Sequence, residues 1–190
     1  MINLIKQKYI GKALLFILVI TLIQSCIVTR NMKKKNDSNM VSFSKESIDG
    51  LYSNKIEGEK WINFGLWDIL YRSSRTKLDS FVDADTSYNV KLELVNENLL
   101  NVKLIKDTIV YNEFNLKGKI DKEYFSVKRK YFLLPIPMLL FHFETKNLIG
   151  NSINGDLIVM HGTKREGWVL FMAGGGGGIS KNRFIKISEK

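Results

Sequence analysis

Few residues in this chain of 190 could do covalent or metal chemistry. It contains one cysteine, Cys26, and two histidines, His142 and His161. The histidines stand in separate predicted strands and at no spacing typical of a metal site. The sequence contains no Gly-x-Ser-x-Gly elbow, the strand-to-helix turn that carries the nucleophile of many hydrolases. We therefore expect no catalytic residue, no metal and no cofactor, and an enzyme is disfavoured.

Ligand recognition is the other chemistry that the residue types suggest, and it centres on Arg129. Alternation with Phe125, Val127 and Tyr131 places Arg129 on the inward face of a strand. An inward charge must be paired, and inside a barrel its partner could be a ligand carboxylate or phosphate. Alternatively, strand twist brings the guanidinium out to water while its stem packs inside. The predicted ligand-binding set is Phe125, Arg129, Tyr131, Phe141 and Phe143.

The segment Tyr131–Phe143 is apolar except for His142. Pro135 and Pro137 are expected to end the strands on either side, since proline lacks an N–H donor. The favoured interpretation is a hairpin tip that folds over an open barrel end and belongs to the core, because apolar runs mostly mean burial. The alternatives are the lip of an apolar cavity, or a surface that touches lipid or a partner.

The elements that must position these residues are mostly strands. Hydrophobic residues alternate with polar ones through Tyr88–Leu94 and Leu100–Leu104, with turn residues between, which predicts a hairpin. The same period predicts strands at Leu116–Ile120 and Phe125–Tyr131. Further short strands are expected at Leu139–Thr145, Asp156–His161, Gly167–Ala173 and Arg183–Ile187, with Gly162–Glu166 as a break and Gly174–Gly178 as a mobile loop tip.

Apart from the N-terminal segment, one region departs from this pattern. Apolar residues recur at helical spacing around Phe64–Arg72, which predicts a short amphipathic helix, and Ile48–Ser53 precedes it as the first strand. Many short strands with local turns are typical of an antiparallel barrel or sandwich. The predicted fold class is therefore all-β, a single antiparallel β-barrel or sandwich with one short N-terminal helix.

The N-terminus has the layout of a secretory signal peptide. Met1–Lys12 carries three lysines and no acid, and Ala13–Ile23 is apolar. A membrane-spanning helix needs about 20 apolar residues, which this run lacks. An uncleaved anchor is the less favoured alternative.

The block Leu22–Cys26 (Leu-Ile-Gln-Ser-Cys) resembles the lipobox of bacterial lipoproteins. This resemblance implies cleavage of a signal peptide spanning 1–25, acylation of Cys26 by fatty chains such as palmitate, and a stable membrane tether. Ile27 stands where an aspartate would signal inner-membrane retention, so we expect the outer membrane, facing the periplasm.

The segment after Cys26 is polar and aperiodic, and we expect it to be a flexible lipidated tether at 26–45 before a β-rich globular domain at 46–190. Removal of Met1–Ser25 lowers the net charge from +10 to +7. The lysines Lys33, Lys34 and Lys35 suit a position beside anionic headgroups. Nothing suggests nucleic acid as a partner.

An opening Gly-x-Tyr segment, Gly50–Tyr52, followed by tryptophans and a meander of strands, is loosely similar to lipocalin-type barrels, although the lipocalin Gly-x-Trp pattern is absent. Two functions follow as expectations. The domain binds an apolar or amphipathic molecule such as a lipid. Alternatively, it is a structural or assembly accessory that contacts another envelope protein.

Overall fold

The computed structural model describes residues 27–36, 39–58, 64–74, 87–128, 130–136, 139–169 and 172–187. Cys26 and Arg129 lie outside this range. The described elements are α2 (Ile27–Lys35), α3 (Lys45–Ile48), β1 (Gly50–Ser53), α4 (Leu66–Ser73), β2 (Asn89–Asn96), β3 (Leu99–Lys106), β4 (Ile109–Asp121), β5 (Tyr124–Val127), β6 (Lys130–Ile136), β7 (Leu139–Asn151), β8 (Leu157–Val169), β9 (Met172–Phe184) and β10 (Lys186–Ile187).

The described strands form one antiparallel sheet with the order β10-β1-β2-β3-β4-β5-β7-β8-β9, and β6 pairs with β7. Ile185 alone separates β9 from β10, so one continuous segment occupies both ends of this order. The Ser53 amide also donates to the Ile185 carbonyl (2.9 Å). The sheet therefore closes on itself as a barrel, in agreement with the predicted all-β class.

The barrel interior is a continuous apolar core. Fully buried side chains come from strands around the whole ring and from α4, among them Tyr52, Trp67, Leu92, Phe125 and Phe184. The predicted hairpin is confirmed as β2 and β3, and the predicted helix as α4. Residues 45–48, of which Ile48 was expected in the first strand, instead form the helical turn α3, capped where the Ser44 hydroxyl accepts from the Ser47 amide (3.2 Å).

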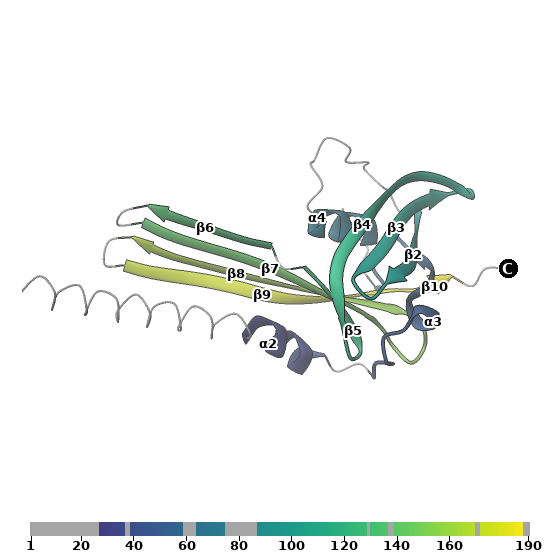
Figure 1. Ribbon diagram of the computed structural model, residues 1–190, viewed down its shortest axis with the longest axis horizontal. Helices are drawn as coiled ribbons and strands as arrows, with labels where there is room; N and C mark the ends of the chain where they lie inside the picture. Colours follow the sequence, from purple (N-terminus) through teal and green to yellow (C-terminus); the bar gives the residue numbers. More distant parts are fainter. Residues whose placement is uncertain are drawn as a thin grey trace, which may run out of the picture.

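Beyond the barrel, the sheet continues as a four-stranded extension that we call the arm: β6 with residues 139–145 of β7, 163–169 of β8 and 172–178 of β9. It projects to one side of the barrel, and α2 lies along β8 and β9 (Figure 1). One face of β7 and β8 continues into the barrel interior through Ile149 and Val159. The other face packs against α2, where Met32 is buried beside Leu148 and Met160.

The arm corrects three expectations about strand ends. Four short strands were expected where β7, β8 and β9 run for 13 residues each. Gly162–Glu166 lies inside β8, and Gly174–Gly178 belongs to β9, paired with Thr163–Gly167, so neither segment is a loop. Pro135 does not end its strand, because β6 is an edge strand and tolerates the missing donor. Long-range pairing overrode these local breaker signals.

Two further differences concern α2 and the apolar hairpin. The residues expected to form a flexible tether include the helix α2, held by the Lys33–Asp121 ion pair (2.7 Å) and by the Asn36 amide, which donates to the Tyr124 hydroxyl (2.6 Å). The hairpin of β6 and β7 does not fold over a barrel end. It forms part of the arm, and Phe132 (57% exposed) and Phe141 (43% exposed) are open to solvent.

Candidate functional site

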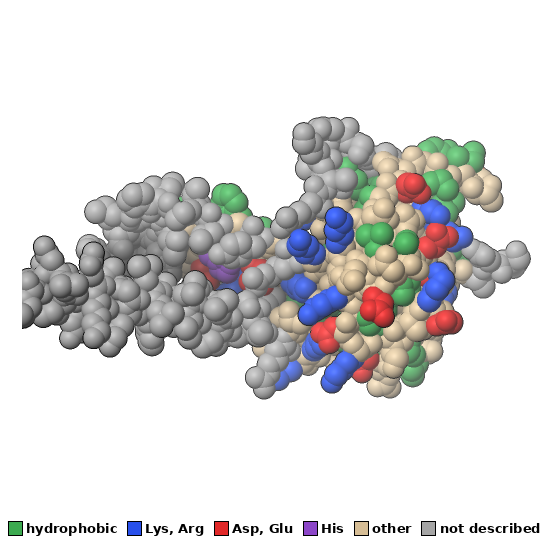
Figure 2. All heavy atoms as spheres, in the orientation of Figure 1, with side chains coloured by type: hydrophobic (Ala, Val, Ile, Leu, Met, Phe, Trp, Pro, Cys, Tyr) green, Lys and Arg blue, Asp and Glu red, His purple; other side chains and the backbone are tan. Residues whose placement is uncertain are grey.

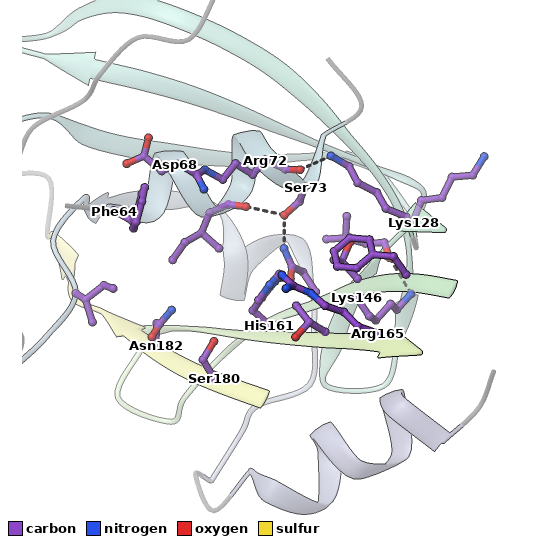
Figure 3. Close-up of a pocket in the computed structure, with 18 residues that line it drawn as sticks. Phe64, Asp68, Arg72, Ser73, Lys128, Lys146, His161, Arg165, Ser180 and Asn182 are labelled. Atoms are coloured by element: carbon purple, nitrogen blue, oxygen red, sulfur yellow. Dashed lines mark hydrogen bonds between the residues drawn. The ribbon is translucent and has the colours of Figure 1, made fainter. Parts of the chain in front are cut away.

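A groove of about 560 Å³ lies where the arm leaves the barrel, between α4 and the inner face of β7, β8 and β9 (Figure 3). Its apolar lining comes from Ile56, Phe64, Ile69, Val127 and Phe143. Its polar lining on the sheet comes from Thr145, Asn147, His161, Thr163, Ser180 and Asn182. The groove therefore has apolar patches within a polar wall.

The charged residues that line the groove are mostly basic: Arg72, Lys128, Lys130, Lys146 and Arg165. Lysine and arginine side chains gather on the barrel near the arm (Figure 2). One carboxylate, Asp68, also lines the groove; it is 1% exposed and accepts a hydrogen bond from the Gly65 amide (2.9 Å). This arrangement favours an anion, since the basic groups outnumber the carboxylate and most of them are more open to water.

Two of the cations rest on aromatic rings. The Arg72 guanidinium lies 4.3 Å from the centroid of Phe64, and that of Arg165 lies 5.4 Å from the centroid of Phe143. Such stacking keeps a guanidinium beside an apolar surface while its N–H groups stay available to a ligand. Lys146 donates from Nζ to the Val127 carbonyl (2.7 Å). Apolar side chains and positive charges therefore lie next to each other in the lining of the groove.

A chain of hydrogen bonds links the sheet side of the groove, at β8 and β7, to α4 on the opposite side. His161 Nδ1 lies 2.6 Å from Asn147 Oδ1, the Asn147 amide donates to the Ser73 hydroxyl, and that hydroxyl donates to the Ile69 carbonyl (2.6 Å). With this amide orientation, Nδ1 of neutral His161 carries the proton and Nε2 is an acceptor. Burial lowers the pKa of His161, which favours the neutral ring.

The roof helix α4 is positioned by a residue of the barrel wall. Asn54 accepts from the Leu66 amide through its carbonyl (2.9 Å) and from the Trp67 amide through its side-chain oxygen (2.8 Å). These bonds satisfy the free N–H groups of the first helical turn. A Cβ at Gly65 would lie 2.4 Å from the Asn54 side chain, so the close approach requires glycine.

The predicted ligand-binding residues are dispersed. Phe143 lines the groove, and Phe141 lines an adjoining shallow hollow that shares Phe143 and Arg165 with it. Phe125 is fully buried and stacks on Phe43 (5.8 Å) instead of lining a cavity. Tyr131 pairs with Glu144 in the backbone register of β6, and its side chain is not described.

The groove's cations on α4, β7 and β8 were not predicted from the sequence. Lys146 and Arg165 alternate with other polar residues in long strands, a pattern that resembles any solvated strand face. Arg72 lies at the end of a helix that was predicted from the spacing of its apolar residues, and that spacing says nothing about the role of its polar residues. Nothing local signals that these three side chains line one groove, because β7 and β8 pair with each other while α4 is held by Asn54 from another part of the sheet.

Within the described ranges, no cluster of three or more His, Cys, Asp or Glu side chains could hold a metal ion. Over the same ranges, no helix has the length and apolar character needed to cross a bilayer. No protein-family model, no curated protein and no solved structure matches the chain.

Proposed function

We propose that this protein is a lipid-anchored protein of the cell envelope that binds an amphipathic anion in the groove beneath α4. The observation that carries the proposal is the combination of five basic side chains with an apolar lining in one cavity. An acidic headgroup would bind among Lys128, Lys130 and Arg165, and an apolar body would contact Ile56, Phe64 and Ile69. A cavity of about 560 Å³ falls within the usual range for small-molecule sites.

The test is native mass spectrometry of the full chain released from non-ionic detergent, with three probes that share one alkyl chain: hexadecyl phosphate, hexadecanol and hexadecyltrimethylammonium. We expect retention of the phosphate over the other two. Combined Lys128→Gln and Arg165→Gln substitutions should weaken phosphate binding about tenfold or more, because each removes a charge-assisted contact. Lys117→Gln, at an exposed position on β4, is the matched control.

Equal retention of the three probes would contradict recognition of an anionic headgroup. Phosphate binding unchanged in the double variant would place the site elsewhere.

The lipid anchor is proposed at Cys26, supported by the lipobox-like sequence Leu22–Cys26. Two or three acyl chains would hold the chain on a membrane, whereas one chain alone binds reversibly. Labelling cells with palmitate should mark the wild-type band and leave Cys26→Ala unmarked. An unmarked wild-type band would refute the anchor and, with it, the outer-membrane location facing the periplasm.

A second candidate is a non-enzymatic accessory that contacts another envelope protein. It is favoured by the start of β4, next to the turn from β3, where Ile109, Val110 and Tyr111 are 59%, 49% and 50% exposed. Consecutive exposed apolar residues on a hairpin are typical of contact surfaces. A photo-crosslinking residue at Val110 in the native envelope should then yield one discrete adduct, and its absence would leave this candidate without support.

A further inference from the structure

The free end of the arm combines two apolar segments that are far apart in the sequence. One is Tyr131–Phe143, which runs from β6 into β7, and the other is Trp168–Ala173, which runs from β8 into β9. The register of the arm aligns them, so that the outermost row across the four strands is Ile136, Leu139, Val169 and Met172. Of these two segments, Phe143 alone among the described residues lines the proposed groove.

The next two rows are also uncharged, and the charges begin at a sharp boundary. The second row is Pro135, Leu140, Trp168 and Ala173, and the third is Leu134, Phe141, Gly167 and Gly174. The fourth row contains His142 and Glu166, whose Nδ1 and Oε2 atoms lie 3.3 Å apart, and the fifth contains Arg165. Three rows at about 3.4 Å per residue give an uncharged end roughly 10 Å deep.

We propose that the free end of the arm inserts into the interfacial region of a lipid bilayer. Elements that lie in this region insert their apolar face to a depth of about 5–10 Å, which matches the depth of the uncharged end. Spanning the hydrocarbon core would take about 30 Å. Phe132 and Phe141 near the boundary are 57% and 43% exposed, as aromatic residues at a membrane surface would be before insertion.

The unpaired edges of the arm limit the depth of insertion. β6 and β9 are the two edge strands of the arm. An open sheet edge cannot enter the hydrocarbon core, because its N–H and C=O groups would have no partners there. Pro135 lies on the edge strand β6 and has no N–H group, which removes one such donor inside the uncharged end. The edge therefore suits the interface and not a span.

The direction of α2 supports a bilayer as the occupant in preference to a protein. This helix lies beneath β8 and β9, and its N-terminal end is turned toward the free end of the arm (Figure 1). Ile27 begins α2, so the residues that precede it in the sequence, Cys26 among them, join α2 at the end turned toward the free end of the arm. The end of the arm could therefore insert into the same membrane as the apolar segment Ala13–Ile23, or as acyl chains on Cys26 if that segment is cleaved off.

The test places an environment-sensitive nitrobenzoxadiazole dye at the end of the arm. The full chain with Cys26→Ser carries one introduced cysteine, Met172→Cys or Val169→Cys, and is reconstituted into vesicles of phosphatidylethanolamine and phosphatidylglycerol. We expect a blue-shifted emission and quenching by nitroxide lipids, stronger from a label near the headgroup than from one deep in the acyl chain. Lys117→Cys on the barrel, with the same dye, should show neither effect.

A water-like emission from both arm positions in vesicles would overturn the proposal. A blue shift without nitroxide quenching would also overturn it, since a protein surface would then cover the arm. The readout does not involve the groove, so it tests the arm independently of ligand binding.

Discussion

At the scale of single residues, His161 is the group most sensitive to what the groove contains. Its Nδ1 is engaged by Asn147, and burial lowers the pKa of the ring, so the neutral form dominates in the empty groove. The charged side chains facing the groove are Asp68, Arg72, Lys128, Lys130, Lys146 and Arg165. An anion bound among them would favour the protonated imidazole and oppose the effect of burial.

Binding of an anion should therefore become tighter as the pH falls. The affinity for the anion rises as the pH drops from about 6.5 through the lowered pKa of His161. The reason is that His161 takes up a proton when the anion binds, and this uptake is favoured at lower pH. We expect the dissociation constant to fall by at most about tenfold for each unit that the pH drops, because one proton is taken up. Isothermal titration with dodecanesulfonate, whose charge is constant over this range, measures the effect.

The His161→Gln variant, which retains a polar side chain but does not titrate, should bind with affinity independent of pH across that window. The same slope in both proteins would exclude His161 as the titrating group.

At the scale of elements, α2 shows how a mostly polar segment becomes ordered by tertiary contacts. Among the side chains of α2 whose burial is described, Met32 is fully buried, and three lysines, Lys33, Lys34 and Lys35, stand in the last turn, where they suit the helix dipole. Lys33 lowers the pKa of Asp121 through their hydrogen bond. This contribution to docking is present above the ordinary pKa of aspartate and is lost as the pH falls through the lowered value.

Truncation of the buried side chain should release α2 without unfolding the barrel. In Met32→Ala, loss of contacts with Leu148 and Met160 should speed amide exchange at residues 27–36 at least tenfold. Exchange in β2 and β3 should stay unchanged. Hydrogen exchange with mass spectrometry measures both, and Lys34→Ala, an exposed position on the same helix, is the control.

Slow exchange retained in α2 of the Met32→Ala protein would show that its polar contacts alone hold the helix.

At the scale of the whole molecule, closure of the barrel depends on the segment that runs from β9 into β10. Asp156, in the turn between β7 and β8, accepts from Arg183 Nε (3.1 Å) and Nη2 (2.6 Å) and from the Lys186 amide (3.1 Å). Arg183 also pairs with Glu57, 3.1 Å from Nε to Oε2. The Asp156 carboxylate therefore contacts both β9 and β10, the first and last strands in the sheet order.

Loss of that carboxylate should weaken the closed barrel. Asp156→Ala is expected to lower the free energy of unfolding by about 1–3 kcal/mol, because it removes a two-contact arginine pair and leaves a backbone amide without its acceptor. Urea titration followed by tryptophan fluorescence measures this. The control is Glu93→Ala, which removes half-exposed pairs with Lys91 and Lys103 and should cost at most about 1 kcal/mol.

Equal losses in the Asp156→Ala and Glu93→Ala proteins would show that closure does not depend on Asp156.

Part of the local structure could be predicted from the sequence. The period of two across Tyr88–Leu104 predicted β2, β3 and their turn, and helical spacing near Trp67 predicted α4, because each pattern reports on one element's own buried face. The all-β class followed from the same signals. The lipobox-like Leu22–Cys26 suggested a location, which stays a prediction.

Only the tertiary structure decided where strands end and which side chains meet. Gly174–Gly178 forms part of β9 because β8 supplies its backbone partners, a long-range contribution that overrides the glycine signal. The groove unites Arg72, Lys146 and Arg165 from α4, β7 and β8. Their common position depends on the register of β7 against β8 and on the packing of α4, which Asn54 holds, and no local pattern of residues encodes either.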